Sequence, residues 1–188
     1  EIADSISLDQ KAEELDVNLI QSNLPEEPEA QIDELISRIQ AQYPESWSLI
    51  RSQGLSYVTE SIKNDLTEFK VHFNHWFFES SLGALSDQQS EISLALNKVQ
   101  QEHAYEKDGA VWLESTKFGD DKDRVIIRED GRGTYLSADL AYHKNKLDRG
   151  FDTIINVWGS DHHGYIKRIE ATIEAMGYKK DQMQVQLV

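Results

Sequence analysis

The sequence contains no cysteine and no long apolar run. Without cysteine, disulfide bonds and thiolate metal sites are excluded. No apolar stretch approaches the roughly 20 residues of a membrane-spanning helix. The chain also opens on Glu1-Ile-Ala-Asp4 rather than on the basic start and apolar stretch of a signal peptide. These absences predict a cytoplasmic protein with no membrane partner.

Basic residues are scarce as well. The 188 residues include 19 lysines and arginines against 34 aspartates and glutamates, which gives a formal net charge of −15. This charge argues against a surface that binds nucleic acid or anionic lipid over its whole extent, because both would be repelled. It suits a cationic small ligand. Because the sequence lacks an initiator methionine and stops within an expected strand at Val188, we expect an internal fragment of a longer protein.

The apolar pattern divides the chain into a mainly helical part, residues 1–68, and an α/β part, residues 69–188. Helical spacing in the first part is clearest at Ile32, Leu35, Ile36 and Ile39. The second part is predicted to begin with a strand over residues 69–78, where apolar and polar residues alternate.

A small β insertion is predicted at about residues 106–133. Two short β-favouring runs, 110–115 and 125–128, are joined by the polar loop 117–124. The three aspartates of this loop superficially resemble a calcium-binding loop, but their spacing, the glycine position and the missing distal glutamate do not fit one. We therefore predict a solvated loop.

The stretch from Thr153 to Gly164 is the most informative part of the chain. A β-branched run ends in Gly159-Ser-Asp161, and apolar residues then recur at helical spacing before a new strand begins at Gln184. Strand, turn, helix and strand in this order predict a βαβ unit with parallel strands. Ligands of such sheets bind at the carboxyl ends of the strands, where Gly159 and Asp161 fall.

This turn has two interpretations. Gly159 would let a sugar or base lie against the backbone, and Asp161 could accept hydrogen bonds from both ribose hydroxyls. Alternatively, Asp161 only caps the following helix. A metal site at His162 and His163 is disfavoured, because adjacent side chains point in different directions and no third ligand follows. One of these histidines is instead expected to face a ligand phosphate.

A second candidate site involves Tyr135 and Asp139, which are four residues apart. We predict a strand end at Tyr135 and a helix over residues 137–147, so that both side chains can face one cleft. A carboxylate beside a phenol suits a guanidinium or ammonium group. The alternative is a buried tyrosine beside a helix-capping aspartate. Glu79 lies in an aromatic stretch, where its charge must reach solvent or meet a cation.

Four motifs together resemble one protein family. They are Trp76–Ser80, Phe118–Arg124, Thr134–His143 and Val157–Tyr165, and they occur in this order in bacterial arginyl-tRNA synthetases. The resemblance covers about residues 69–188, and the first part is more loosely similar to a helical insertion of these enzymes. It implies an α/β fold that forms part of the Rossmann-type, parallel-sheet core of a class I synthetase, with a helical insertion and a small β-hairpin insertion.

The resemblance also implies an activity. The parent protein would be a ligase of protein biosynthesis that activates arginine with ATP, accompanied by Mg²⁺, and transfers it to the arginine tRNA. Tyr135 and Asp139 match the pair that holds the substrate arginine in the family, and Glu79 matches a second carboxylate facing its guanidinium. tRNA would bind mostly through parts outside this sequence, and the resemblance assigns no bound metal to this stretch.

For the nucleotide, Gly159 and Asp161 match the turn that many class I synthetases place against the adenylate ribose. His162 and His163 stand where some relatives carry glutamine or arginine. The two nucleotide signatures of the family lie outside the printed sequence, so the fragment alone is expected to be inactive. Two alternatives remain open: a nucleotidyltransferase of the same superfamily that uses another cationic substrate, and a non-catalytic module that binds a partner.

Overall fold

The computed structural model describes residues 16–188 and divides into two compact units, which meet in the sequence between His75 and Trp76. Within the described residues, no helix combines the length and the apolar character that are needed to cross a bilayer. The assignments of residues 1–68 as a helical insertion and of residues 106–133 as a β insertion stay predictions.

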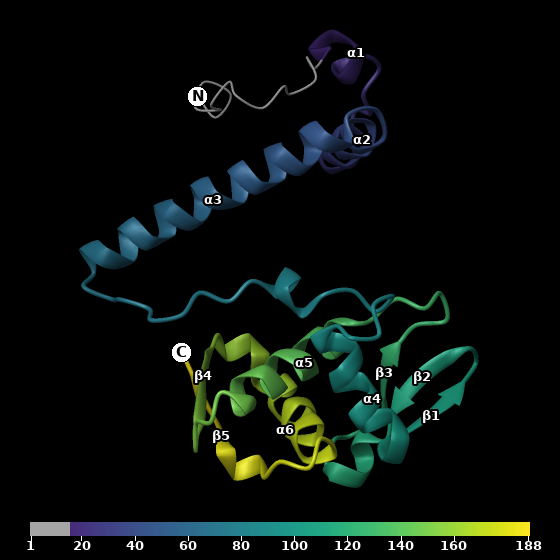
Figure 1. The fold of residues 1–188 in the computed structure, drawn as a ribbon, viewed down its shortest axis with the longest axis vertical. Helices are drawn as coiled ribbons and strands as arrows, with labels where there is room; N and C mark the ends of the chain where they lie inside the picture. The colour runs from purple at the N-terminus through teal and green to yellow at the C-terminus, as the bar shows by residue number, and fades with distance from the viewer. Residues whose placement is uncertain (1–15) are drawn as a thin grey trace. The chain divides into compact units, whose positions relative to one another are not determined.

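The described part of the first unit is helical. It contains α1 (Val17–Gln21), α2 (Pro28–Gln42) and α3 (Pro44–Glu68) (Figure 1). A proline opens both α2 and α3, because the first turn of a helix does not need its missing N–H group. The carboxylate of Glu27 caps α2 by accepting hydrogen bonds from two backbone N–H groups of the first turn. The helix predicted from the spacing of Ile32 to Ile39 is confirmed.

The strand predicted over residues 69–78 is wrong. The helix α3 ends at Glu68, and neither sheet of the described chain includes the following segment. Phe69 and Phe73 are 80% and 58% exposed. Alternation of side chains favours an extended backbone, but a strand also requires a neighbouring strand for its hydrogen bonds, which a local pattern cannot supply.

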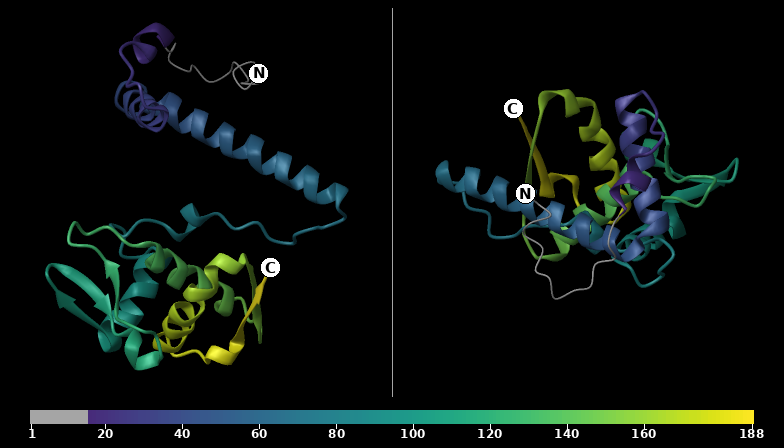
Figure 2. Two further views of the ribbon diagram at one scale, coloured as in Figure 1. Left: turned by 180° about the vertical axis from the view of Figure 1, so that it is seen from behind. Right: turned by 90° about the horizontal axis from the view of Figure 1, so that it is seen from above.

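The second unit is a mixed α/β structure. Its elements in chain order are η2 (Glu79–Leu82), α4 (Glu91–His103), β1 (Ala104–Lys107), β2 (Ala110–Leu113), η3 (Ser115–Phe118), β3 (Arg124–Ile127), α5 (Tyr135–Asp148), β4 (Ile154–Trp158), η4 (Ser160–Tyr165), α6 (Ile166–Ala175), η5 (Lys180–Gln182) and β5 (Met183–Leu187). Within this unit the two sheets lie at opposite ends, with the helices α4, α5 and α6 between them (Figure 1, Figure 2).

The two sheets have different topologies. The strands β1, β2 and β3 form an antiparallel sheet in this order. Asp108 and Gly109 connect β1 and β2 with positive φ angles of 53° and 74°, as a tight two-residue hairpin turn requires. The strands β4 and β5 are parallel, with Ile154 opposite Met183. Since α6 connects them, the predicted βαβ unit is confirmed, and so are the short strands predicted around residues 110–115 and 125–128.

The start of α5 is fixed to β3 by hydrogen bonds. The Thr134 hydroxyl donates to the Val125 carbonyl oxygen at 2.9 Å, and the Ser137 hydroxyl donates to the Ile126 carbonyl oxygen. The Ser137 oxygen also accepts from the Thr134 N–H at 3.2 Å, which completes a helix N-terminus. The helix therefore begins at Tyr135, two residues earlier than predicted, and Tyr135 belongs to its first turn rather than to a strand end.

An apolar core holds α4, α5 and α6 together. Its largest fully buried apolar side chains are Leu82, Leu96, Val99, Leu113, Ile126, Leu140, Ile169, Ile173 and Met176. The strand β4 contributes one face to this core: Ile154 is buried, whereas Ile155 and Val157 are 64% and 65% exposed. Trp158 at the carboxyl end of β4 also packs against this core, as do Ala138 and Tyr142 of α5.

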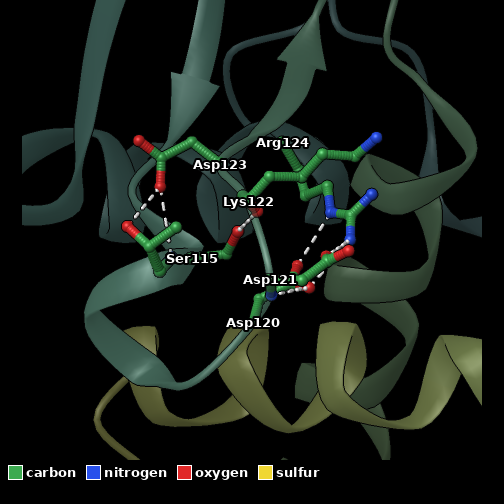
Figure 3. Close-up of polar contacts among 7 residues, drawn as sticks. Ser115, Asp120, Asp121, Lys122, Asp123 and Arg124 are labelled. Atoms are coloured by element: carbon green, nitrogen blue, oxygen red, sulfur yellow. Dashed lines mark hydrogen bonds and ion pairs between the residues drawn. The ribbon is translucent and has the colours of Figure 1, made fainter.

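The loop between β2 and β3 is not a solvated loop throughout, which corrects the prediction. The Asp120 side chain is 3% exposed and the Arg124 side chain 13%. Arg124 Nε and one terminal nitrogen each donate to Asp120 at 2.8 Å, and Arg124 also pairs with the exposed Asp121 (Figure 3). Burial opposes ionisation of Asp120, but the hydrogen bonds from Arg124 and Asp121 and the charge of Arg124 together outweigh it and lower the pKa of this carboxyl group.

The remainder of this loop is fixed by its own polar contacts. Asp123 accepts hydrogen bonds from the Thr116 N–H at 3.1 Å and from the Thr116 hydroxyl at 2.7 Å. The Ser115 hydroxyl donates to the Lys122 carbonyl oxygen at 2.7 Å (Figure 3). All three aspartates therefore make polar contacts that hold the loop, and Asp120 does so while buried, a role for which their sequence spacing gives no signal.

Candidate functional site

A pocket of about 540 Å³ opens where the start of α5 meets the end of β4 and η4. It is lined by Tyr135, Asp139, Trp158, His162 and Tyr165. The structure thus brings the predicted pair on α5 together with one residue of the predicted nucleotide turn. Trp158 and Tyr165 complete the lining, and the sequence analysis missed both.

Tyr135 and Asp139 lie one turn apart on the same face of α5, because residues four apart on a helix are neighbours. Tyr135 is 84% exposed, which rules out the alternative of a buried tyrosine. Asp139 is partly buried and lies in the second turn, while Thr134 occupies the N-cap position. The alternative of a capping aspartate is therefore wrong as well.

Asp139 is held by a tyrosine from a different element. The Tyr165 hydroxyl donates to Asp139 Oδ2 at 2.6 Å. Burial and this hydrogen bond raise the pKa of the Tyr165 phenol, so it stays a protonated donor at neutral pH. This hydrogen bond is made to one of the two carboxylate oxygens of Asp139.

Aromatic rings form the wall around this carboxylate. The Trp158 ring meets the Tyr165 ring edge to face, with centroids 6.1 Å apart and planes at 61°. It meets His162 in a similar arrangement, at 6.4 Å and 60°. A partly buried carboxylate among aromatic faces suits a planar cation, which can pair with the charge and stack on the rings.

The turn after β4 has the compact form expected of its glycine. A Cβ atom at Gly159 would lie 2.6 Å from Asp161 Oδ1, so a side chain here would displace the carboxylate. The Asp161 side chain is 82% exposed, and its Oδ2 lies 3.8 Å from His162 Nε2. The N-cap residue is Gly159 for η4 and Tyr165 for α6, and neither helix start has a side-chain cap, so the capping alternative for Asp161 gains no support.

The remaining predicted residues lie outside this lining. Among the described residues, Glu79, Gly159, Asp161 and His163 do not line the pocket, although three of them belong to the adjoining turn. Glu79 begins η2 and is exposed. The described residues also contain no group of three or more His, Asp or Glu side chains that could hold a metal ion.

A largely buried network of polar side chains links α5 to β4. The Lys146 ammonium donates to Asn156 Oδ1 at 2.8 Å, and Asn156 Nδ2 lies 2.9 Å from His143 Nε2. His143 Nδ1 lies 2.8 Å from the Asp139 carbonyl oxygen. Burial, together with the nearby Lys146, lowers the pKa of His143 to about 4, so the ring is neutral at pH 7.

The hydrogen bonds of this network are consistent with one placement of its protons. A neutral His143 donates from Nδ1 to the Asp139 carbonyl and accepts from Asn156 at Nε2, which leaves the Asn156 oxygen for the lysine. Asn156 is 6% exposed on β4, so the network fixes the strand relative to the helix turn that carries Asp139. Sequence analysis missed it because its members are residues of a helix and a strand that meet only in the fold.

Comparison with known proteins gives one consistent result. A family model described as "tRNA synthetases class I (R), catalytic domain" matches residues 26–188. The arginine–tRNA ligase of Bacillus subtilis is 51% identical over 145 residues, which are 77% of this chain and 25% of that protein. The arginine–tRNA ligase of Acinetobacter baumannii strain AYE is 44% identical over 179 residues, 95% of this chain and 29% of that protein.

Solved structures agree with the sequence matches. A crystal structure described as an arginyl-tRNA synthetase from Campylobacter jejuni has a TM-score of 0.69 and 34% identity, covering 87% of this chain and 37% of that one. The Thermus thermophilus arginyl-tRNA synthetase, at 15% identity and a TM-score of 0.60, shares the fold. The chain spans only about a quarter of the length of the curated relatives it matches.

Proposed function

Since the chain belongs to the family of class I arginyl-tRNA synthetase catalytic domains, we propose that it supplies the arginine-binding part of an arginine–tRNA ligase. The observation that carries this proposal is the pocket in which Asp139 lies among the rings of Tyr135, Trp158 and Tyr165. The whole enzyme would join arginine to AMP and then transfer it to tRNA in the cytoplasm.

The pocket chemistry favours a guanidinium over other cations. The guanidinium of arginine is planar, delocalised and weakly hydrated, so it can hydrogen-bond a carboxylate and stack on an aromatic face at once. Asp139 would supply the charge, and Tyr135 would close the site from the same helix face. A lysine ammonium is a compact point charge that lacks the planar geometry. We further propose that Glu79, which is exposed at the start of η2, is a second carboxylate for the substrate; η2 packs against α5, the helix that carries Asp139.

The nucleotide would bind beside this pocket at the carboxyl end of β4. Gly159 lets the adenylate ribose approach the backbone, and the exposed Asp161 is free to accept its hydroxyls. His162 lines the arginine pocket and also neighbours Asp161, so it would stand between the two subsites. His163 would face the phosphates from the same turn. Mg²⁺ would arrive with ATP and be held chiefly by its phosphate oxygens.

The reaction itself needs no protein nucleophile. The arginine carboxylate attacks the α-phosphorus of ATP and pyrophosphate leaves. A hydroxyl of the terminal tRNA adenosine then attacks the arginyl carbonyl, and AMP leaves. The residues described here would act by holding arginine and the ribose in a reactive orientation, which alone can lower a barrier substantially.

We also propose how this sequence fits into a larger catalytic core. Residues 69–188 would form the second part of a Rossmann-type core, of which β4, α6 and β5 are one βαβ unit. Residues 1–68 would be a helical insertion, and residues 106–133 a β insertion. The fold match at a TM-score of 0.69 supports this assignment.

The proposal is tested with a complete enzyme that contains this chain. In the presence of tRNA, arginine should support ATP–pyrophosphate exchange, and lysine and citrulline at the same concentration should not. Citrulline matches arginine in shape but carries no charge, so it isolates the contribution of the carboxylate. Exchange with lysine equal to that with arginine would favour a nucleotidyltransferase for another cationic substrate.

Asp161→Ala should impair the nucleotide rather than arginine. Because the Asp161 side chain is 82% exposed, water competes for its hydrogen bonds, and we expect roughly a threefold to tenfold rise in the KM for ATP. The penalty should be smaller with 2′-deoxy-ATP, which already lacks one of the two hydroxyls. Equal penalties for both nucleotides would mean that Asp161 does not contact the 2′-hydroxyl.

A further inference from the structure

Tyr165 connects two elements that are distant in sequence at the site of the proposed arginine pocket. It ends η4 and precedes α6, whereas the carboxylate that it contacts lies on α5. Its hydroxyl donates to Asp139 Oδ2 at 2.6 Å. This is a charge-assisted hydrogen bond, a class that is shorter and stronger than a bond between neutral groups.

The Tyr165 ring is itself held in place. It is half-buried, it packs edge to face against Trp158 with centroids 6.1 Å apart, and the Arg168 guanidinium carbon lies 4.6 Å from its ring centroid. Contacts on the ring therefore fix the direction of the hydroxyl. A fixed donor can orient a carboxylate, whereas a mobile donor would merely follow it.

Besides a cationic ligand in the pocket, a lysine of the protein can attract the Asp139 carboxylate. The Lys146 ammonium is one of the charges that interact with Asp139, although it now donates to Asn156 and lies 4.2 Å from the centroid of the Tyr142 ring. Lys146 does not line the pocket, whereas Tyr165 does. If the hydroxyl were removed, the carboxylate could turn toward the buried lysine and away from a ligand in the pocket.

We propose that Tyr165 is a positioning residue of the arginine site, which holds Asp139 toward the pocket with one oxygen and leaves the other for the substrate guanidinium. This inference rests on the proposed function. The Asp139 carboxylate would then select arginine, and its orientation would be set by Tyr165 of η4. The same element η4 carries Asp161, the proposed ribose ligand. The two subsites would then be built on one short segment.

The test is Tyr165→Phe in a complete enzyme that contains this chain. The change removes one hydroxyl and keeps the ring, so the KM for arginine should rise roughly threefold to thirtyfold, while the KM for ATP stays within about twofold. Because a KM does not depend on the amount of active enzyme, partial loss of folded protein cannot imitate this result.

Tyr178→Phe is a matched control. The Tyr178 hydroxyl donates to Asp148 Oδ1 at 2.6 Å, the same type of bond on the same helix α5, and neither residue lines the pocket. This variant should leave the KM for arginine unchanged. If both variants raise it equally, or if Tyr165→Phe raises the KM for ATP as much as that for arginine, the role of Tyr165 is structural and the proposal is overturned.

Combining Tyr165→Phe with Asp139→Ala separates this inference from the proposed function. If Tyr165 acts through Asp139, the double variant should bind arginine about as weakly as Asp139→Ala alone, because alanine leaves the hydroxyl no carboxylate to hold. Additive losses would overturn the positioning role. An effect of Asp139→Ala without any effect of Tyr165→Phe would overturn it too, and would leave the proposed function standing. If Asp139→Ala itself has no effect on arginine, the assignment of the site fails and the inference fails with it.

Discussion

Asp139→Asn should lower kcat/KM for arginine by about tenfold to a hundredfold in a complete enzyme that contains this chain, because a charge-assisted hydrogen bond contributes about 1.5–3 kcal/mol. Asparagine keeps the shape of the side chain and can still accept the Tyr165 hydroxyl, so the charge is the main thing lost. The KM for ATP should change far less, since the proposed ribose contact is made by Asp161.

The measurement is ATP–pyrophosphate exchange in the presence of tRNA, at varied arginine and fixed, saturating ATP. Asp148→Asn is the matched control: Asp148 also lies on α5 and also accepts a tyrosine hydroxyl at 2.6 Å, but it does not line the pocket. It should leave kcat/KM for arginine within about twofold of the wild-type value, as expected for a group that makes no contact to substrate. An Asp139→Asn enzyme with an unchanged response to arginine would contradict the proposed role.

Arg124→Met should destabilise the second unit by about 3–5 kcal/mol, because it leaves the charge of a nearly fully buried carboxylate without its partner. Asp120 is 3% exposed and receives two hydrogen bonds of 2.8 Å from Arg124. Methionine has similar length and fills the space of the removed side chain. Chemical denaturation followed by tryptophan fluorescence would give the change in the free energy of unfolding.

Arg132→Met provides a control of the same chemistry at the surface. Arg132 and Asp130 also form an ion pair, with Nε 2.8 Å from Oδ2, but their side chains are 75% and 41% exposed. Water screens an exposed pair, which therefore contributes little to stability, so the free energy of unfolding of this variant should be close to that of the wild type. If Arg124→Met and Arg132→Met lower the free energy of unfolding equally, the burial of Asp120 is not the cause of the destabilisation.

The effect of Arg124→Met should depend on pH. The folded-state pKa of Asp120 is lowered, so as the pH falls below the ordinary aspartate value of about 4 the unfolded chain takes up the proton first, and the stability from this pair is lost. The pair therefore stabilises the fold fully at neutral pH and less in acid. The difference in unfolding free energy between wild type and variant should be largest near pH 7 and should narrow toward pH 3.

The sequence was sufficient for the βαβ unit and for the pair on α5. Helical spacing between two β-branched runs is a local signal, and it predicted β4, α6 and β5. The four-residue spacing of Tyr135 and Asp139 was also enough to predict that they share a cleft. The helix start was misplaced by two residues, because the hydrogen bonds that define it come from Ser137 and from the carbonyl groups of β3.

Other features could not be predicted from patterns of neighbouring residues. The alternation in residues 69–78 is typical of a strand, yet the segment belongs to neither sheet of the described chain, because pairing depends on a second strand. The aspartates of the loop before β3 read as solvated, although Asp120 is enclosed and paired with Arg124. The sequence shows where the aspartates are but not whether the fold buries them.

By itself, the sequence determined the strand, helix and strand of the βαβ unit, the turn at Gly159 that follows its first strand, and the acidic and aromatic residue types available for a cationic ligand. These follow from periodicity and turn chemistry, which act over a few residues. Only the tertiary structure decided that Tyr165 from η4 would hold Asp139 of α5, and that His143, Asn156 and Lys146 would link that helix to β4. Those contacts join residues 10 to 26 positions apart in the sequence. Their geometry is set by how α5, β4 and η4 pack together rather than by any neighbour in the chain.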